Sequence, residues 1–212
     1  MLTLHGSPVS NYYNKVKLAL LEKGVAFDEV RAPTQKPEVA VRGVSPLGKI
    51  PYITTDEGGL CESQAILEWI DARYPQPPLM PSDPFAAAKV RELTTFLDWH
   101  LEIAARQLYG VAFFGAPPLA DATATRIRKQ LDDAIAAVKR LAKFSPFIAG
   151  EQFTLADCAA FAHLPLVGMA TTKVLGEDVL LAAGLDYKPY IKMIAARPSG
   201  QKVVADRRAQ NG

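Results

Sequence analysis

The chain has 212 residues, 49% of them apolar, with 24 Lys and Arg against 22 Asp and Glu, so its composition is that of an ordinary globular protein. A net charge of +2 offers no strongly basic surface for nucleic acid or anionic membranes, and Cys61 and Cys158 form neither a CxxC nor a disulfide framework. The longest uncharged run, residues 158–172, is too short to cross a bilayer and no signal peptide is visible, so we expect a cytoplasmic protein.

Before residue 75, short runs of strand type alternate with helical patterns. Gly6-Ser7-Pro8 interrupts the first strand, and Gly24 follows the first helix as a stop signal. We expect strand 2–5, helix 14–23, strand 26–31, a partly helical connection over 35–44, a hairpin over 52–61 and a helix over 63–73. The order β-α-β-(α)-β-β-α predicts a small α/β sandwich.

Five prolines fall within residues 75–84, PQPPLMPSDP, and this composition predicts an extended linker. Beyond it the apolar residues have helical period, and the strongly apolar stretch 155–172 is typical of the central helix of a bundle. We expect helices over 85–114, 120–143, 155–172, 178–183 and 189–195, with a weakly patterned tail after Pro198. The expected domains are therefore 1–77 (α/β), a linker 78–84, and 85–212 (all α).

Thr154-Leu155-Ala156-Asp157 has the form of a capping box, so Asp157 is predicted to start a helix and not to act as a catalytic carboxylate. The three histidines, His5, His100 and His163, share no placement with a serine, and no GxSxG motif is present. Serine-protease chemistry is therefore not expected.

Three short motifs of the first domain could bind an anion or a peptide backbone. Ser10 is either a plain helix N-cap or a hydroxyl donor to an anion at the positive helix end. Pro51 either opens an edge strand or forms a cis bond that turns the backbone of Ile50 toward a ligand. In Glu62-Ser63, Ser63 is predicted to be the N-cap of the helix that follows, and the N-terminus of that helix could also bind a carboxylate.

These motifs, in their order and spacing, resemble the cytosolic glutathione transferases over nearly the whole chain. The matching segments are SPVSNYYNKVKLALLEKG, SPLGKIP, ESQAI, the proline-rich linker and PFIAGEQFTLADCAAF. The resemblance implies a thioredoxin-like N-terminal domain, an all-helical C-terminal domain, glutathione as co-substrate without a metal, and a homodimer. Among the family's branches, the serine-type, theta- or phi-like bacterial enzymes are the most similar.

The resemblance also implies roles for individual residues. Ser10 would stabilise the glutathione thiolate, and Ile50, beside a cis Pro51, would pair through its main chain with the cysteinyl unit. The remaining glutathione-binding positions are Glu62 and Ser63 for the γ-glutamyl end, and Gln35, Lys36 and Lys49 for the glycyl carboxylate.

This chain departs from the family pattern at two positions. Asn11 follows the serine where proline is frequent, and Lys15 replaces the usual arginine of that helix. Tyr12 and Tyr13 leave open a tyrosine contribution to thiol activation, although neither lies in the first strand, where tyrosine-type enzymes carry theirs.

The expected activity is conjugation of glutathione to small hydrophobic electrophiles, as in detoxification. The candidate residues of the electrophile pocket are Tyr12, Trp99, Arg106, Tyr109 and Phe113. Two alternatives stay open: a glutathione-dependent isomerase or dehalogenase, and a non-catalytic binding protein on the same scaffold. A thioredoxin-like oxidoreductase is not expected, because Ser10 stands at the position of the reactive cysteine.

Overall fold

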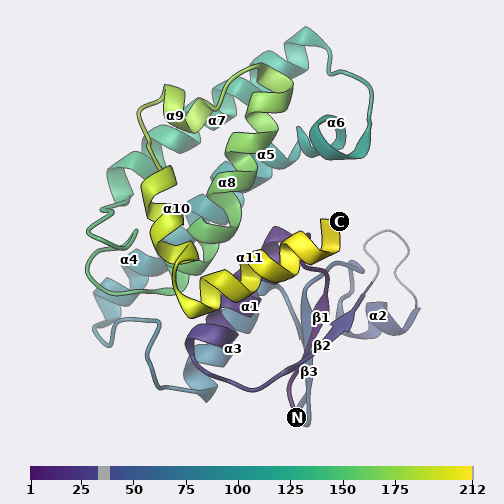
Figure 1. The fold of residues 1–212 in the computed structure, drawn as a ribbon, viewed down its shortest axis with the longest axis vertical. Coiled ribbons are helices and arrows are strands. Elements are labelled where there is room, and N and C mark those ends of the chain that lie inside the picture. The colour runs from purple at the N-terminus through teal and green to yellow at the C-terminus, as the bar shows by residue number, and fades with distance from the viewer. Residues whose placement is uncertain (33–38, 212) are drawn as a thin grey trace. The chain divides into compact units, whose positions relative to one another are not determined.

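A computed structural model of the protein describes residues 1–32 and 39–211. The chain divides into two compact units, one of Met1–Met80 with Ala195–Gly212 and the other of Pro81–Ile194 (Figure 1). The first unit is α/β and the second is helical, which confirms the expected fold class. In this division the C-terminal segment belongs to the α/β unit, whereas the boundaries proposed from the sequence assign it to the helical domain.

The α/β unit is built on one mixed sheet of four strands in the order β2-β1-β3-β4. The strands are β1 (Thr3–Gly6), β2 (Asp28–Arg31), β3 (Tyr52–Thr55) and β4 (Gly58–Cys61). Strand β1 runs parallel to β2 and antiparallel to β3, and β3 pairs antiparallel with β4 through the predicted hairpin. All four expected strands are therefore present.

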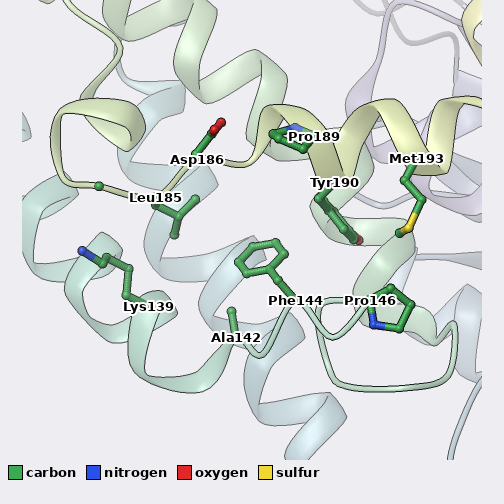
Figure 2. Close-up of a pocket in the computed structure, with 10 residues that line it drawn as sticks. Lys139, Ala142, Phe144, Pro146, Leu185, Asp186, Pro189, Tyr190 and Met193 are labelled. Carbon is green, nitrogen blue, oxygen red and sulfur yellow. The ribbon is translucent and has the colours of Figure 1, made fainter.

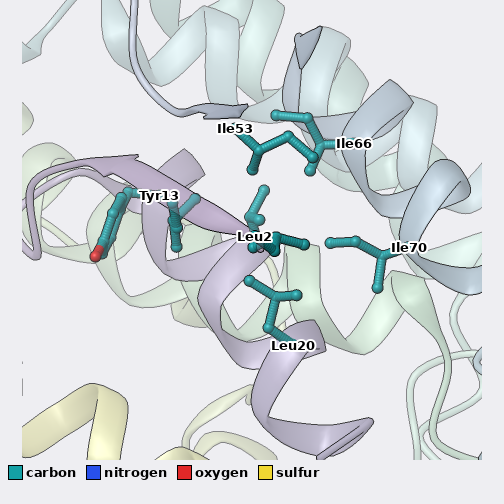
Figure 3. Packing of buried hydrophobic residues seen from close by; sticks show 8 residues of the cluster. Leu2, Tyr13, Leu20, Ile53, Ile66 and Ile70 are labelled. Atoms are coloured by element: carbon teal, nitrogen blue, oxygen red, sulfur yellow. The ribbon is translucent and has the colours of Figure 1, made fainter. Parts of the chain in front are cut away.

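Helices α1 (Asn11–Glu22) and α3 (Ser63–Arg73) pack together and contribute to the core on one face of the sheet. Their buried residues meet alternate residues of the strands, as expected for a pleated surface. The cluster, most of which Figure 3 labels, consists of Leu2, Leu4, Tyr13, Val16, Leu20, Ile53, Ile66 and Ile70. Full burial of each aliphatic side chain contributes roughly 1.5–3 kcal/mol, so this core fixes both helices on the sheet.

The short helix α2 (Val39–Val44) approaches strand β4. Val44 packs against the small cluster of Ala32 and Tyr52, and a Cβ on Gly59 would lie only 2.5 Å from Val44 Cγ1. Glycine is therefore required at residue 59 for this close approach.

Helix α11 (Pro198–Asn211) lies beside α1 (Figure 1) and is an element that the sequence analysis missed. Ion pairs hold α11 against the rest of the unit. Arg197, just before the helix, donates to Glu22 of α1 at 2.6 Å, and Asp206 of α11 accepts from the buried ammonium of Lys17. The same ammonium also pairs with Glu29 at 2.6 Å. The helix has only a weak apolar stripe, because Val203 is its principal buried hydrophobic residue. Periodicity alone therefore gave no signal for this helix.

The helical unit contains eight consecutive helical segments. They are α4 (Pro84–Thr95), the π-helical segment η1 (Phe96–Glu102), α5 (Ile103–Arg106), α6 (Tyr109–Phe114), α7 (Asp121–Leu141), α8 (Leu155–Leu175), α9 (Val179–Ala182) and α10 (Lys188–Ala195). The single helix expected over 85–114 is thus wrong in detail: a π-helical segment interrupts it and residues 107–108 break it, before Gly115 ends it with φ of 69°.

Helix α8 is the central helix of this unit, as predicted, and every residue from Leu155 to Leu164 is buried. By length and composition α8 could cross a membrane, but 61% of its apolar window is buried inside the unit, as for a core helix. His163 of α8 contacts the carboxylate of Asp98 at 2.9 Å, so it is a packed histidine with a partner.

The capping box at the start of α8 is confirmed. Asp157 accepts the backbone N–H of Thr154 at 2.7 Å and that of Ile148 at 2.9 Å, and it also accepts the hydroxyl of Tyr190 at 2.7 Å. Burial raises the pKa of the Asp157 carboxyl, although its hydrogen bonds lower it in part. Asp157 is therefore a structural residue that ties the helix start to the preceding loop and to α10.

Replacing Asp157 by Ala leaves these buried donors without an acceptor, so we expect Asp157→Ala to lower the free energy of unfolding by about 2–4 kcal/mol. Chemical denaturation measures this loss, and Asp133→Ala, which removes an exposed carboxylate of α7, is the control. A loss no larger than that of the control would contradict the assigned role.

The docking of α11 is expected to weaken in acid. Burial alone would raise the pKa values of Glu22 and Asp206, but hydrogen bonds from Arg197 and Ser199, and from Lys17 and Lys202, lower both below their ordinary values. A carboxyl with a lowered pKa stabilises the fold above its unfolded pKa, and this stability is lost as the pH falls through the folded pKa, hence below about pH 4. Hydrogen exchange should therefore show lower protection factors for the α11 amides below that pH than above it, once the intrinsic pH dependence of amide exchange is corrected for, and equal protection factors would contradict the account.

Candidate functional site

The three motifs predicted to bind an anion or a backbone meet at one end of the sheet. The register pairs His5 with Tyr52 and Tyr52 with Cys61, so the end of β1, the start of β3 and the end of β4 are neighbours. The loop before α1 follows β1, the Ile50–Pro51 bond precedes β3, and α3 follows β4. Strand pairing therefore brings the loop before α1 together with two segments that lie at least 40 residues further along the chain.

Ser10 is the N-cap of α1 and has an extended backbone. Its Oγ accepts the N–H of Tyr13 at 3.3 Å, and its own N–H donates to the carbonyl of Ser7 at 2.9 Å. The capping interpretation of Ser10 is therefore confirmed. Because Oγ accepts in this cap, the hydroxyl proton is directed elsewhere and can be donated to a ligand.

Tyr13 faces away from such a ligand. Its hydroxyl donates to Glu29 of β2, and its ring covers the backbone of Gly6, where a Cβ would come within 2.4 Å of Tyr13 Cδ2. Burial, together with the Glu29 carboxylate, raises the pKa of Tyr13 far above its ordinary value. Tyr13 is therefore a packing residue that supports the end of β1, whereas Tyr12 is partly exposed.

The segment before β3 is shaped by Ser45, a buried residue that the sequence analysis did not single out. Its Oγ accepts the N–H of Lys49 at 3.0 Å and donates to the Lys49 carbonyl at 2.8 Å, around a turn in which Gly48 has φ of 62°. The Ile50–Pro51 bond that follows is cis. The side chain of Lys49 is exposed at this end of the sheet.

At the end of β4, Glu62 and not Ser63 is the N-cap of α3, and Ser63 is the first helical residue. The expected serine cap is thus wrong by one position. Glu62 has φ of 68°, a conformation that costs a non-glycine residue on the order of 1–3 kcal/mol and is concentrated at functional sites. Ser63 is buried, and its hydroxyl lies 3.5 Å from the ammonium of Lys15.

Lys15 is the second residue that the sequence analysis left out of the candidate site. Its side chain is fully buried, and its ammonium donates to Gln64 Oε1 at 3.1 Å at the first turn of α3. The available signal was a cation at an inward-facing position of α1, four residues before the core residue Ala19. Lys15 links the two helices whose N-termini face the same end of the sheet.

The site is therefore suited to anions. The N-termini of α1 and α3 both point backbone N–H groups and a partial positive charge at it, and the ammonium groups of Lys15 and Lys49 outnumber the one carboxylate of Glu62. A ligand with a carboxylate at one end and an ionisable group in the middle matches this arrangement. Gln35 and Lys36, which were expected to take part, lie outside the described residues.

Three of the expected electrophile-pocket residues lie close together on α5 and α6. The guanidinium of Arg106, held by Glu102 at 2.6 Å, lies 5.3 Å from the ring centre of Tyr109, and the rings of Tyr109 and Phe113 are 5.3 Å apart. Trp99 is elsewhere: it is 62% exposed and lines a groove of about 370 Å³ that residues of α7 border.

The helical unit also has a larger cavity, of about 520 Å³, between the end of α7 and α10 (Figure 2). Phe144, Leu185, Tyr190 and Met193 line it, with Lys139 at its rim. It includes no residue that the sequence analysis assigned to a site. Within residues 1–32 and 39–211, no group of three or more His, Cys, Asp or Glu side chains is placed to hold a metal ion.

Comparison with known proteins identifies the family. Residues 4–78 match the N-terminal domain of glutathione S-transferase and residues 64–182 match its C-terminal domain. A glutathione S-transferase of Pseudomonas putida is 40% identical over 211 residues, covering 99% of this chain and 94% of that protein. The chain belongs to the glutathione S-transferase family.

Two further relatives are informative. A stringent starvation protein A homolog of Pasteurella multocida is 30% identical, covering 94% of this chain and 88% of that protein. A glutathione S-transferase of Methylobacterium radiotolerans, whose structure is a complex with glutathione sulfonate, has 25% identity and a TM-score of 0.76, covering 96% of this chain and 94% of that one.

Proposed function

We propose that this protein is a serine-type glutathione transferase in which the Ser10 hydroxyl donates a hydrogen bond to the glutathione thiolate. The observation that carries the proposal is the Ser10 cap: Oγ accepts from Tyr13, which leaves the O–H proton available at the positive end of α1. The 40% identity to a glutathione S-transferase over nearly the full chain supports the reaction class.

The same end of the sheet offers partners for the rest of the tripeptide. In our proposal the backbone of Ile50, beside Pro51, pairs with the cysteinyl unit, while Glu62 and Ser63 hold the γ-glutamyl end. Lys15 supports Ser63 and Gln64 from within the unit. Gln35, Lys36 and Lys49 remain the residues proposed for the glycyl carboxylate.

The energies required are modest. A thiol of pKa about 8.5 is only a few per cent ionised at neutral pH, and lowering its pKa by about two units requires about 2.7 kcal/mol. A hydrogen bond to a charged group contributes about 1.5–3 kcal/mol and a helix N-terminus about 0.3–1 kcal/mol. The hydrogen bond from Ser10 at the start of α1 can therefore lower the pKa of the thiol by this amount, and the thiol proton passes to solvent water without a general base. The thiolate sulfur then forms a bond to an electrophilic carbon, and that carbon's leaving group departs with the electron pair.

For the electrophile we propose a small hydrophobic molecule, for which Arg106, Tyr109 and Phe113 of the helical unit are the proposed contacts. Tyr12 stays a candidate contact from the sequence alone. The aromatic rings of Tyr109 and Phe113 supply apolar contact area, and Arg106 offers a cation for a polar substituent. A glutathione-dependent isomerase or dehalogenase would use the same thiolate. Cys61 is a poor candidate for thiol exchange, because burial and the neighbouring Glu62 raise the pKa of its thiol.

The second candidate function is a non-catalytic binding protein, for which the similarity to a stringent starvation protein A homolog is the specific observation. The two functions differ in their need for glutathione. A conjugating enzyme must be retained on immobilised glutathione and released by free glutathione, whereas a non-catalytic relative without a working site must pass through.

Replacing Ser10 tests the transferase proposal directly. We expect Ser10→Ala to raise the pKa of enzyme-bound glutathione by about one to two units and to lower kcat/KM at neutral pH by about ten- to hundredfold. The bound thiolate is followed by its ultraviolet absorbance as the pH is varied.

Two controls separate activation from capping. Ser10→Thr keeps the hydroxyl and should keep most of the activity, and Tyr13→Phe, which removes the hydroxyl directed at Glu29, should leave the thiol titration unchanged. If Ser10→Ala titrates and conjugates like the parent protein, the role proposed for Ser10 is wrong.

We also propose a cytoplasmic homodimer. Trp99 and Ile103 are exposed apolar residues of one groove, and burial of such a surface favours association. This exposure is the reason for proposing Trp99 as a contact between subunits rather than as part of the electrophile pocket.

A charge in the groove should oppose this association. We expect Trp99→Glu to be a monomer at micromolar concentration in analytical ultracentrifugation, where the parent protein is a dimer. Phe85→Glu, at an aromatic residue of α4 that is more exposed than Trp99, is the control and should remain a dimer. A dimeric Trp99→Glu would place the contact on another surface.

A further inference from the structure

Asn14 is a buried polar residue of α1 to which no role has been given above. It lies one helical turn after Ser10, and only 4% of its surface is exposed. Asparagine is unfavourable inside a helix, so at this position it costs stability relative to an apolar residue. The hydrogen bonds of its side-chain amide indicate that it holds the loop before α1.

The side-chain Nδ2 of Asn14 donates to the carbonyl of Pro8 at 2.8 Å, and its backbone N–H donates to the carbonyl of Ser10 at 3.0 Å. One residue thus holds two points of the loop that carries the Ser10 hydroxyl. The loop's other backbone closure is the bond from Ser10 N–H to Ser7. Val9, at the middle of the loop, is 46% exposed, so packing holds that part only weakly.

The amide oxygen of Asn14 is buried and has no hydrogen-bond partner within the part of the chain that the structure describes. The bond to Pro8 fixes its orientation, because only the nitrogen of the amide can donate to a carbonyl. A buried acceptor without a donor lowers the stability of the folded state. A residue kept only for stability would not need this oxygen.

We propose that Asn14 is a positioning residue for thiol activation, which holds the Pro8 carbonyl and thereby aims the Ser10 hydroxyl at the glutathione sulfur. The inference rests on the proposed function of Ser10. The Nδ2–H to Pro8 bond sets the position of the loop that carries the Ser10 hydroxyl.

If the proposal is right, a substitution of Asn14 should weaken activation of the glutathione thiol without lowering the stability of the fold. Asn14→Leu replaces the amide with an apolar side chain of similar size, removing both the bond to Pro8 and the unsatisfied oxygen. Leucine is also the better helix former. We therefore expect Asn14→Leu to have an unfolding temperature equal to or above that of the parent protein, while its Ser7–Ser10 loop is less well held.

The test is the pH titration of the glutathione thiol bound to Asn14→Leu, with kcat/KM measured across the same pH range. We expect the pKa of the thiol to rise by about one unit and kcat/KM to fall about tenfold near neutral pH, with the difference shrinking above the new pKa. Asn14→Ala also removes the amide but adds no bulk, and it should shift the titration in the same direction. It replaces Asn14→Leu in the test if the leucine side chain is too large for the protein to fold.

Either of two outcomes would overturn the inference, and Ser10→Ala shows whether the proposed function fails with it. An unchanged titration in both variants would make Asn14 a purely structural residue, as would a fall in unfolding temperature without any change in the pH profile. Ser10→Ala is measured in parallel: if it shifts the titration and the Asn14 variants do not, only the inference about Asn14 fails. If Ser10→Ala also leaves the titration unchanged, the proposed function itself fails.

Discussion

The pairing of β1 with its two neighbours is the constraint on which the site depends. Because β1 is antiparallel to β3, and β3 to β4, the end of β1 lies beside the start of β3 and the end of β4. Each of these points leads into or out of a loop that carries a candidate residue: Ser10, Ile50 and Glu62. A slip of one residue would turn every strand side chain to the opposite face and separate the loops from their helices. The cores on both faces of the sheet hold the register, and thus the site, in place.

Helix α1 carries the residues that link the sheet to the candidate site, because residues on its different faces contact different parts of the α/β unit. Ser10 caps its start, Asn14 holds the loop before it, and Lys15 reaches the first turn of α3. Lys17, on a further face, is buried between Glu29 of β2 and Asp206 of α11. The C-terminal helix is therefore part of the α/β unit. Two of these side chains are buried ammonium groups, which are stable only while their partners are in place.

The sequence was sufficient for the four strands, the hairpin and the capping residues Ser10 and Thr154, because turn residues and local periodicity determine them. It placed the start of the first helix at residue 14, whereas α1 begins at Asn11. The sequence was not sufficient where contacts between residues far apart in the chain determine the structure. Helix α11 is held by ion pairs with residues far away in the chain, and the π-helical segment η1 has no local signature. The resemblance to a family supplied the roles of the motifs, which single residues had left open between capping and binding. It did not reveal Lys15 or Asn14 as site residues, because their importance lies in what they contact.

The central claim is that the anion-binding end of the sheet holds glutathione with its sulfur at Ser10. A crystal structure of the protein with bound glutathione tests it most directly. The account predicts the sulfur within about 3–3.5 Å of Ser10 Oγ, the cysteinyl backbone paired with Ile50, and the γ-glutamyl carboxylate at the start of α3. Glutathione bound with its sulfur against Tyr12 or Cys61, or away from this end of the sheet, would contradict it.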